Sequence, residues 1–343
     1  MGSLPPDPAV AERPRMVAAF DKFKATASAV DLSEAAASMA RAGGWSTTVL
    51  PLADGGEGSL GVLGGANKHT EVRGPLGEPV VAGWRLDGRT AFIEMAEASG
   101  LGLVGGPENN RTLEASTAGT GELIARAMKL GATKIFVFVG GSATTDGGWG
   151  AVEAIVAPSR LRGIELVVAT DVRTCFLDAA KVFGPQKGAS PTQVRFLSRR
   201  LESVASLYKD RYGVDVTKAV GGGAAGGLAG GLLAVGGKIE SGFEVIANHI
   251  GLDEQLEDAD LVVTGEGRLD AESFNGKVVG GVVSWASSCG VPALIIVGSQ
   301  DPEFCPPAGL EVIRLDELYG TARSMQSPCG LVAEVVRKRL APS

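Results

Sequence analysis

Five short segments, called clusters below, each contain at least one acidic residue and follow apolar runs of the chain. Most of these acidic residues lie beside glycines or lysines. The clusters are residues 21–24 (DKFK), 54–57 (DGGE), 142–148 (SATTDGG), the single Asp171, and 266–270 (EGRLD). Ligands of open α/β sheets bind at the carboxyl ends of the strands, so chemistry is expected at these segments. One such cluster is only a turn, whereas five together predict a site for a polyphosphate and its metal ion.

The residue types in these clusters suit phosphoryl transfer. Glycines allow backbone N–H groups to reach phosphate oxygens, and carboxylates hold Mg²⁺ directly or through water. Lysines neutralise the charge on the transferred group. The only histidines are His69 and His249, without ligand spacing. A zinc site and a histidine-based triad are therefore disfavoured, and a carboxylate is expected as any general base.

Sequence motifs of the commoner nucleotide-binding enzymes are absent or weak. No segment fits GxxxxGK[ST], because Gly276-Lys277 is followed by Val278, and the HRD and DFG sequences of protein kinases are missing. Residues 221–226 match GxGxxG, but no clear acidic residue ends a strand about 20 residues later. Tight helix packing is the favoured interpretation of that segment.

Alternating apolar runs and helical patterns predict the elements that position these clusters. Residues 69–95 differ, because short apolar segments separated by Gly74-Pro75 and Asp87-Gly88 are typical of antiparallel hairpins. Elsewhere the pattern indicates parallel βαβ units. The expected strands are 16–20, 47–52, 135–139, 164–169, 260–264 and 293–297, and the expected helices are one beginning at Asp31, 122–130, 193–208, 279–288 and 331–340, with a glycine-alanine helix or loop over 221–237.

The fold class is therefore predicted as α/β with two domains. A Rossmann-like parallel α/β domain is built from both ends of the chain, residues 16–64 plus 260–343. An α/β domain with an antiparallel portion is inserted over residues 65–259. Residues 1–15, with four prolines and no apolar core, are expected to form a disordered leader.

Composition limits the class of protein and its partners. The 343 residues are 45% hydrophobic and 21% charged, which is typical of a packed globular protein. A formal charge of −7 argues against nucleic-acid and anionic-membrane partners. The four cysteines have no CxxC spacing, and no run approaches about 18 apolar residues, so a cytoplasmic protein without a membrane span is expected. The oligomeric state stays open.

In these same segments the chain resembles the bacterial glycerate kinase family with two α/β domains. The resemblance covers nearly all of the chain after residue 15. The matching stretches are FDKFKATASA (20–29), PLADGGEGS (51–59), EMAEASGL (94–101), STAGTGELI (116–124), GGSATTDGG (140–148), FGPQKGA (183–189), GGGAAGGL (221–228) and LVVTGEGRLDAESFNGK (261–277). The resemblance implies ATP- and Mg²⁺-dependent phosphorylation of the small hydroxy acid D-glycerate, at its 2-hydroxyl.

The candidate site residues come from the five clusters, from the neighbouring Gly141 and from Lys277. Catalytic roles are expected for Lys24, Asp171, Arg268 and Asp270, with Asp171 as general base; nucleotide or substrate binding for Asp21, Gly55, Gly56, Gly141, Ser142, Thr144, Gly147, Glu266 and Lys277; and Mg²⁺ binding for Asp54, Glu57 and Asp146. Each has a plainer alternative. Asp54, Glu57 and Asp171 could cap helices, residues 142–146 could only form turn hydrogen bonds, and residues 266–277 could form a surface cluster of ion pairs.

Departures from the family pattern keep two other functions open. Residues 21–24 read DKFK where the family has DSFK, residues 170–172 read TDV where it has CDV, and the Asn-Pro-Leu that follows is missing. Glu272-Ser273 replaces Gln-Thr, and the chain is shorter than the family pattern between Gly150 and Ile164. A catalytically altered or inactive ligand-binding paralogue, or a kinase for another small hydroxy acid, is therefore the alternative.

Overall fold

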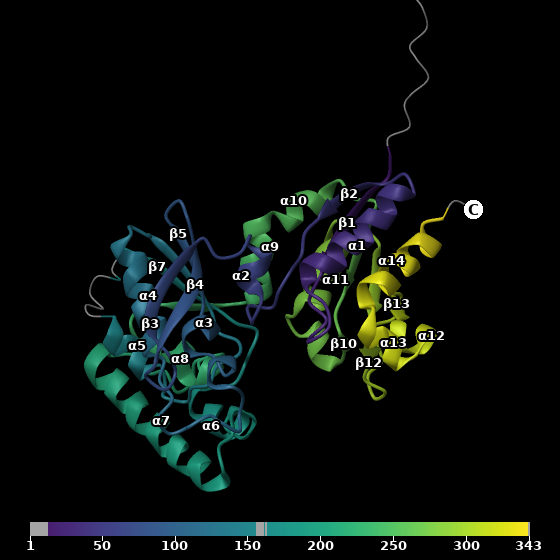
Figure 1. The fold of residues 1–343 in the computed structure, drawn as a ribbon. Helices are drawn as coiled ribbons and strands as arrows, with labels where there is room; N and C mark the ends of the chain where they lie inside the picture. Colours follow the sequence, from purple (N-terminus) through teal and green to yellow (C-terminus); the bar gives the residue numbers. More distant parts are fainter. Residues whose placement is uncertain (1–12, 156–160, 162, 342–343) are drawn as a thin grey trace, which may run out of the picture. The chain divides into compact units, whose positions relative to one another are not determined.

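The chain divides into two compact units in the computed structural model, which describes residues 13–155, 161 and 163–341 (Figure 1). Unit 1 comprises Met1–Leu52 and Ala247–Ser343, and unit 2 comprises Ala53–Ile246. Both units are α/β, which confirms the predicted fold class. Most of the expected leader, residues 1–12, lies outside the described residues, as do residues 156–160 and 162 of the segment expected to be shorter than the family pattern.

Unit 1 contains a five-stranded sheet with the order β13-β11-β9-β1-β2, and every pairing in it is parallel. Its strands are β1 (Arg15–Phe20), β2 (Ser46–Val49), β9 (Leu261–Gly265), β11 (Ala293–Val297) and β13 (Glu311–Arg314). Its helices are α1 (Ala29–Ala42), α10 (Leu252–Glu257), α11 (Val278–Ser288), α12 (Leu315–Tyr319), α13 (Thr321–Gln326) and α14 (Pro328–Arg339), and β10 (Arg268–Leu269) pairs with β12 (Ser299–Gln300).

Helices cover both faces of the unit 1 sheet. Along β11, Leu294 and Ile296 pack with α1 and α14, whereas Ile295 and Val297 pack with Val279 of α11. This alternation follows from the two-residue period of a strand. A strand buried on both faces is continuously apolar, which is why β1 and β11 could be recognised in the sequence.

Unit 2 contains a six-stranded mixed sheet with the order β3-β4-β5-β6-β7-β8. The pairs β3–β4 and β4–β5 are antiparallel, as the Asp87-Gly88 turn predicted, and the later pairs are parallel. Its strands are β3 (Lys68–Arg73), β4 (Pro79–Asp87), β5 (Thr90–Glu94), β6 (Lys134–Phe138), β7 (Glu165–Ala169) and β8 (Lys238–Glu240). Its helices are α2 (Ser59–Val62), α3 (Ala96–Ser99), α4 (Ala118–Lys129), α5 (Trp149–Ala154), α6 (Ala179–Phe183), α7 (Pro191–Tyr212) and α8 (Ala224–Ala234), and α9 (Gly242–Ile250) continues into unit 1.

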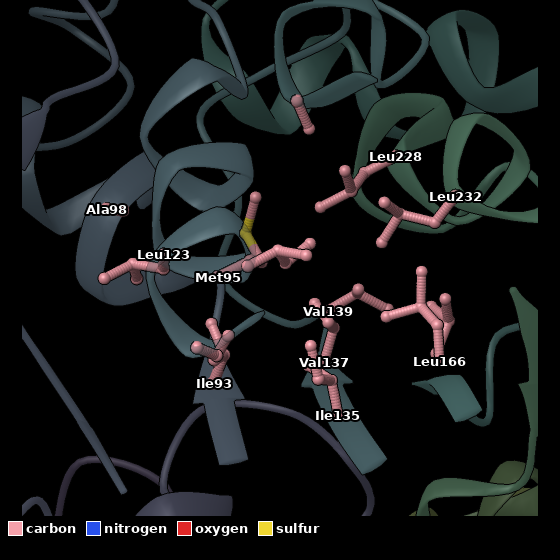
Figure 2. Close-up of a cluster of buried hydrophobic side chains, with 14 of the residues drawn as sticks. Ile93, Met95, Ala98, Leu123, Ile135, Val137, Val139, Leu166, Leu228 and Leu232 are labelled. Atoms are coloured by element: carbon pink, nitrogen blue, oxygen red, sulfur yellow. The ribbon is translucent and has the colours of Figure 1, made fainter. Parts of the chain in front are cut away.

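The main core of unit 2 lies between one face of this sheet and helices α4 and α8. Figure 2 shows Ile93 and Val137 of the strands near Leu123 of α4 and Leu228 and Leu232 of α8. Phe92 and Phe136 lie on the opposite face, where their rings stack with centroids 5.4 Å apart. This core fixes the positions at which β5, β6 and β7 end.

The segment 221–237 shows why glycine is abundant in unit 2. Ala225, Gly226 and Gly227 adopt left-handed conformations inside the segment assigned to α8. A Cβ atom at Gly226 would overlap the carbonyl oxygen of Thr144. The glycines therefore let α8 contact the backbone of the loop after β6, so tight packing explains the GxGxxG match.

Two details of the sequence-based elements need correction. The first helix begins at Ala29 rather than Asp31, because Ser28 is its N-cap and accepts a hydrogen bond from the Asp31 N–H group at 3.1 Å. The units divide after Leu52 and after Ile246, earlier than the predicted boundaries after residues 64 and 259. Residues 53–64 belong to unit 2 because α2 packs on β5, where the Leu60 N–H group donates to the buried Glu94 carboxylate at 2.5 Å.

Across the described ranges, no helix is both long enough and apolar enough to cross a membrane.

Candidate functional site

Four backbone segments of unit 2 meet closely around residues 54–56, which the sequence singled out. A Cβ atom at Gly55 would lie 2.9 Å from the carbonyl oxygen of Ala169, at the end of β7, and one at Gly140 would lie 2.5 Å from Cα of Gly56. A Cβ atom at Gly242 would overlap the carbonyl oxygen of Asp54. Glycine therefore allows the loops after β2, β6 and β7 and the start of α9 to touch backbone to backbone.

Asp171 lies at this meeting point with its two carboxylate oxygens in different surroundings. Its Oδ1 accepts hydrogen bonds from Ser241 Oγ at 2.9 Å and from the Gly242 N–H group at 3.0 Å. Its Oδ2 is buried and has no hydrogen-bond partner among the described residues. One oxygen is thus held in place, and the other is free to take a proton.

The pKa of Asp171 is raised to about 7. Burial is the largest cause, because it disfavours the charged form, and the negative charge of Asp54 adds to it. The hydrogen bonds from Ser241 and Gly242 act in the opposite direction. A carboxylate with a pKa near neutrality is suited to general-base chemistry.

Gly141 is the exposed residue of the loop after β6, and Ser142 follows it directly. Gly141 has a φ of 68°, and a Cβ atom there would lie 3.7 Å from Oε2 of Glu57. Ser142 is nearly buried, and its Oγ accepts a hydrogen bond from Nζ of Lys187 at 2.7 Å. The loops 54–57 and 140–142 therefore share one surface.

Asp146 lies deeper in unit 2 and holds the starts of two helices. Its carboxylate accepts hydrogen bonds from the N–H and hydroxyl groups of Thr117 before α4, at 2.9 and 2.8 Å. It also accepts from the N–H groups of Gly148 and Gly150 at α5, at 3.0 and 3.2 Å. Four donors within the protein occupy this carboxylate, so the geometry supports a structural role in place of the expected Mg²⁺ ligand.

Thr144 and Gly147, expected to bind nucleotide, are also buried. The Thr144 side chain is 0% exposed, and a Cβ atom at Gly147 would lie 2.9 Å from the Val204 side chain. The Gly147 carbonyl accepts a hydrogen bond from the Tyr208 hydroxyl at 2.9 Å. These contacts place both residues in the packing beneath the accessible part of the loop.

In unit 1, a second group of predicted residues follows the neighbouring strands β1 and β9. The N–H group of Asp21 donates to the carbonyl of Gly265 at 3.0 Å. A Cβ atom at Gly267 would lie 3.3 Å from the backbone nitrogen of Lys24, whose side chain is exposed. The loops 21–24 and 265–268 are therefore in contact.

Glu266 is the buried acid of this second group. Burial raises its pKa to about 7, and the charges of Asp21 and Asp270 add to the effect. Ser273 and Lys277 oppose it. Its Oε1 is buried without a hydrogen-bond partner among the described residues.

Three other charged residues of the second group have hydrogen-bond or ion-pair partners within unit 1. Oδ1 of Asp270 accepts from the N–H groups of Glu272 and Ser273, at 2.9 and 3.2 Å, and so caps the 3₁₀ turn Ala271–Phe274. The exposed Arg268 pairs with Asp301 at 2.9 Å, and Lys277 pairs with Glu272 at 2.8 Å. The two ion pairs match the surface cluster considered as the alternative for residues 266–277, whereas the cap formed by Asp270 was not among the alternatives.

The structure thus assembles the predicted residues as two groups, each within its own unit. Asp54, Glu57, Gly141, Ser142 and Asp171 lie together in unit 2. Asp21, Lys24, Glu266, Asp270 and Lys277 lie in unit 1, near Arg268.

Two residues with evident roles at the unit 2 group were missed. Ser241 directly follows the three-residue strand β8, and attention to the end of every strand would have found it. Lys187 lies within the matching stretch 183–189, but the sequence around it does not reveal that its side chain is buried, so it could not be recognised as a site residue.

The unit 2 group suits a hard divalent cation. No cluster of three or more metal-ligating side chains occurs in the parts of the chain that the structure describes. However, Mg²⁺ is commonly bound by one or two carboxylates together with substrate phosphates. The charge of Asp54 raises the pKa of Asp171, so two carboxylates lie close together, which is an environment that a cation stabilises.

Comparisons with known proteins agree along most of the chain. The sequence model of the glycerate kinase family matches residues 16–158 and 155–322. Glycerate 2-kinase of Escherichia coli (strain K12) is 40% identical over 288 residues, which cover 73% of this chain and 75% of the relative. Glycerate kinase of Bacillus subtilis (strain 168) is 37% identical over 326 residues, covering 83% and 85%. A crystal structure described as a "putative glycerate kinase 2" from Salmonella typhimurium LT2 matches with a TM-score of 0.81 and 34% identity, covering 96% of this chain and 98% of that chain.

Fold and relatives together define an α/β kinase, an enzyme that transfers a phosphoryl group. The chain belongs to the glycerate kinase family, which confirms the resemblance drawn from the sequence. The two stretches matched by the family model meet at residues 155–158, within the segment that was expected to be shorter than the family pattern.

Proposed function

We propose that this protein is a glycerate kinase that transfers the γ-phosphoryl group of ATP to the 2-hydroxyl of D-glycerate. Family membership supports ATP as the donor and glycerate as the acceptor. The choice of the 2-hydroxyl is supported by the 40% identity to a glycerate 2-kinase.

The observation that carries the proposal is the environment of Asp171. Ser241 and Gly242 hold one oxygen, while the other is buried without a partner. With a pKa of about 7, its carboxylate is able to accept the hydroxyl proton as the new O–P bond forms. Positioning and charge stabilisation contribute most of the rate enhancement in phosphoryl transfer, so this proton transfer is one part of catalysis.

The neighbouring residues are proposed to bind the phosphates and the cation. Gly141 and Ser142 offer a backbone N–H group and a hydroxyl to phosphate oxygens. Asp54, with Glu57, would hold Mg²⁺, which when bound supplies positive charge that offsets the charge of the phosphates. Asp146 is left out of this set because its four hydrogen bonds occupy its carboxylate.

Within unit 1, the second group is proposed to bind an anionic substrate group. Lys24 and Lys277 are cations suited to phosphate oxygens, and Arg268 can grip a carboxylate or phosphate with two parallel hydrogen bonds. Asp21 and Glu266 are proposed to contact the nucleotide. Asp270 is proposed to hold the loop that carries Arg268, through its hydrogen bonds to the 3₁₀ turn.

The test is a coupled assay of ADP release with ATP, Mg²⁺ and a panel of small hydroxy acids. D-glycerate is expected to give the highest kcat/KM, and phosphorus NMR of the product should show 2-phosphoglycerate. Nucleotide binding without ADP release above background would instead favour a non-catalytic paralogue. If another hydroxy acid gives a higher kcat/KM, that acid and not glycerate is the preferred substrate.

A further inference from the structure

Lys187 is a buried lysine that the proposed reaction does not yet use. It ends the 3₁₀ turn Pro185–Lys187 and is only 4% exposed. Its Nζ donates hydrogen bonds to Ser142 Oγ and to the carbonyl oxygen of Thr144, both at 2.7 Å. Burial lowers its pKa to about 7, while the Asp146 carboxylate opposes the shift. Burying an ammonium group costs free energy, so its presence beneath this loop needs a reason.

The loop above Lys187 is held from a second direction by Asn110. Its Nδ2 donates to the carbonyl oxygens of Ala143 and Lys187, both at 2.9 Å. Two side chains therefore fix consecutive carbonyl groups of the loop, at residues 143 and 144. The hydroxyl of Ser142 is fixed at the border between this buried part and the exposed Gly141.

The hydrogen bond to Lys187 decides which way the Ser142 hydroxyl can donate. In its protonated form Lys187 has three donors and no acceptor, so in that form Ser142 Oγ is the acceptor of this bond. The hydroxyl proton is then directed away from Lys187. Without Lys187, the hydroxyl could rotate and would have no fixed direction.

We infer that Lys187 is a positioning residue, which orients the Ser142 hydroxyl to donate a hydrogen bond to an anionic oxygen of the bound substrates. This inference rests on the proposed function, because it requires substrate at the loop after β6. The anionic oxygen belongs to a phosphate of ATP or to the carboxylate of glycerate, and the two sources are distinguished by separate measurements. Lys187 itself acts only through Ser142.

The test combines the variants Lys187→Met, Ser142→Ala and the double variant of the full-length protein. Methionine has nearly the length of lysine but no donor. The affinity for ATP with Mg²⁺ is measured by calorimetry without glycerate. The affinity for adenosine, which has no phosphates, is measured in the same way. The KM for D-glycerate is measured at saturating ATP. Lys181→Met on the exposed face of α6 is the matched control.

Each single variant is expected to weaken ATP binding, or to raise the KM for D-glycerate, by about tenfold, the equivalent of one hydrogen bond to a charged group. Adenosine affinity should stay within about twofold in every variant. In the Ser142→Ala background, Lys187→Met should add little further loss, because the two residues act through one hydrogen bond. Lys181→Met should match the wild type.

Several results would overturn the inference. One is an equal loss of ATP affinity, or an equal rise in the KM for D-glycerate, when Lys187→Met is introduced with and without the Ser142 hydroxyl. Another is a loss of adenosine affinity of similar size to the loss of ATP affinity. If Lys187→Met does not fold, Ser142→Ala alone still decides, since unchanged ATP affinity and unchanged KM in that variant contradict the inference. If the wild type binds ATP but does not phosphorylate glycerate, the proposed function fails while the ATP measurements still test Lys187.

Discussion

The two carboxylate oxygens of Asp171 lie in different surroundings, which determine its hydrogen bonds and its pKa. Ser241 and Gly242 bind Oδ1, and burial together with Asp54 raises the pKa to about 7. A residue held in this way is costly for stability, because the folded protein must desolvate it. Function and stability should therefore respond in opposite directions when its charge is removed.

Asp171→Asn should stabilise the protein in a pH-dependent way. The folded state of the wild type holds the Asp171 proton up to a pH near 7, whereas the unfolded state releases it near the ordinary aspartate pKa of 3.8. The wild type therefore loses free energy of unfolding as the pH rises between these two values, and the variant does not. Each pKa unit is worth about 1.4 kcal/mol, so the variant should gain on the order of 2–4 kcal/mol at pH 8 and little at pH 4.

This gain is measured by urea unfolding of both proteins in EDTA across that pH range. Asp178→Asn, at an exposed carboxylate of the 3₁₀ turn Phe176–Asp178, is the matched control and should show no such trend. A difference between wild type and Asp171→Asn that does not vary with pH would contradict the raised pKa.

Ser241→Ala should shift the pH dependence of kcat. The hydrogen bond from Ser241 lowers the pKa of Asp171, so its loss should move the acid limb of the kcat profile to higher pH by about one unit. Ser241 also accepts a hydrogen bond from the Glu244 N–H group in α9, so some loss of stability is expected.

The control for that loss is Ser190→Ala, which removes the N-cap of α7. It should lower stability without moving the pH profile. An unshifted profile in Ser241→Ala would show that the hydrogen bond does not tune Asp171.

At the scale of elements, the first residue of α9 brings Asp54 and Asp171 together. The Gly242 N–H group binds Asp171, and its Cα atom packs on the backbone of residues 54 and 55. Helix α9 begins in unit 2 and continues into unit 1. Its start therefore links the end of β7 to the loop after β2.

Gly242→Ala should reduce both stability and activity. The added methyl group would overlap the carbonyl oxygen of Asp54, so the backbone must shift, at a cost of about 1–3 kcal/mol. Gly61→Ala in α2 is the matched control, since a Cβ atom there meets nothing within 4 Å. That control should keep full kcat and gain up to about 1 kcal/mol from higher helix propensity. Full activity in Gly242→Ala, measured beside the control, would contradict the close packing at this position.

At the scale of the whole molecule, each unit has its own sheet and its own core. The buried clusters of unit 2 lie within residues 72–239, and those of unit 1 come from both ends of the chain. Unit 2 is also continuous in sequence. It therefore meets the conditions for folding alone.

A fragment of residues 53–250, which retains all of α9, should fold and unfold cooperatively. Circular dichroism during thermal unfolding measures this. The fragment should not phosphorylate glycerate, because Lys24, Arg268 and Lys277 are absent from it. A fragment without a cooperative transition would show that unit 2 depends on unit 1 for its stability.

The ends of most strands could be predicted from the sequence, but the burial of the side chains that follow them could not. The strand Ala293–Val297 and the clusters after β1, β7 and β9 were recognisable because apolar runs stop at charged or glycine residues. Asp54 and Asp146 look alike in sequence, as each precedes two glycines, yet Asp146 accepts hydrogen bonds from four donors at the starts of α4 and α5. Strand β8 was missed because its three residues, Lys238–Glu240, are mostly polar, and Ser241 was missed with it.

The most direct test of the central claim is the kcat of ADP release from ATP, Mg²⁺ and D-glycerate, compared between the wild type and Asp171→Asn. Turnover of D-glycerate by the wild type is predicted, with a loss of about 10²–10⁴-fold in the folded variant, the usual contribution of a general base. A variant that retains the wild-type kcat would contradict the role of Asp171, and a folded wild type without turnover would contradict the proposed activity itself.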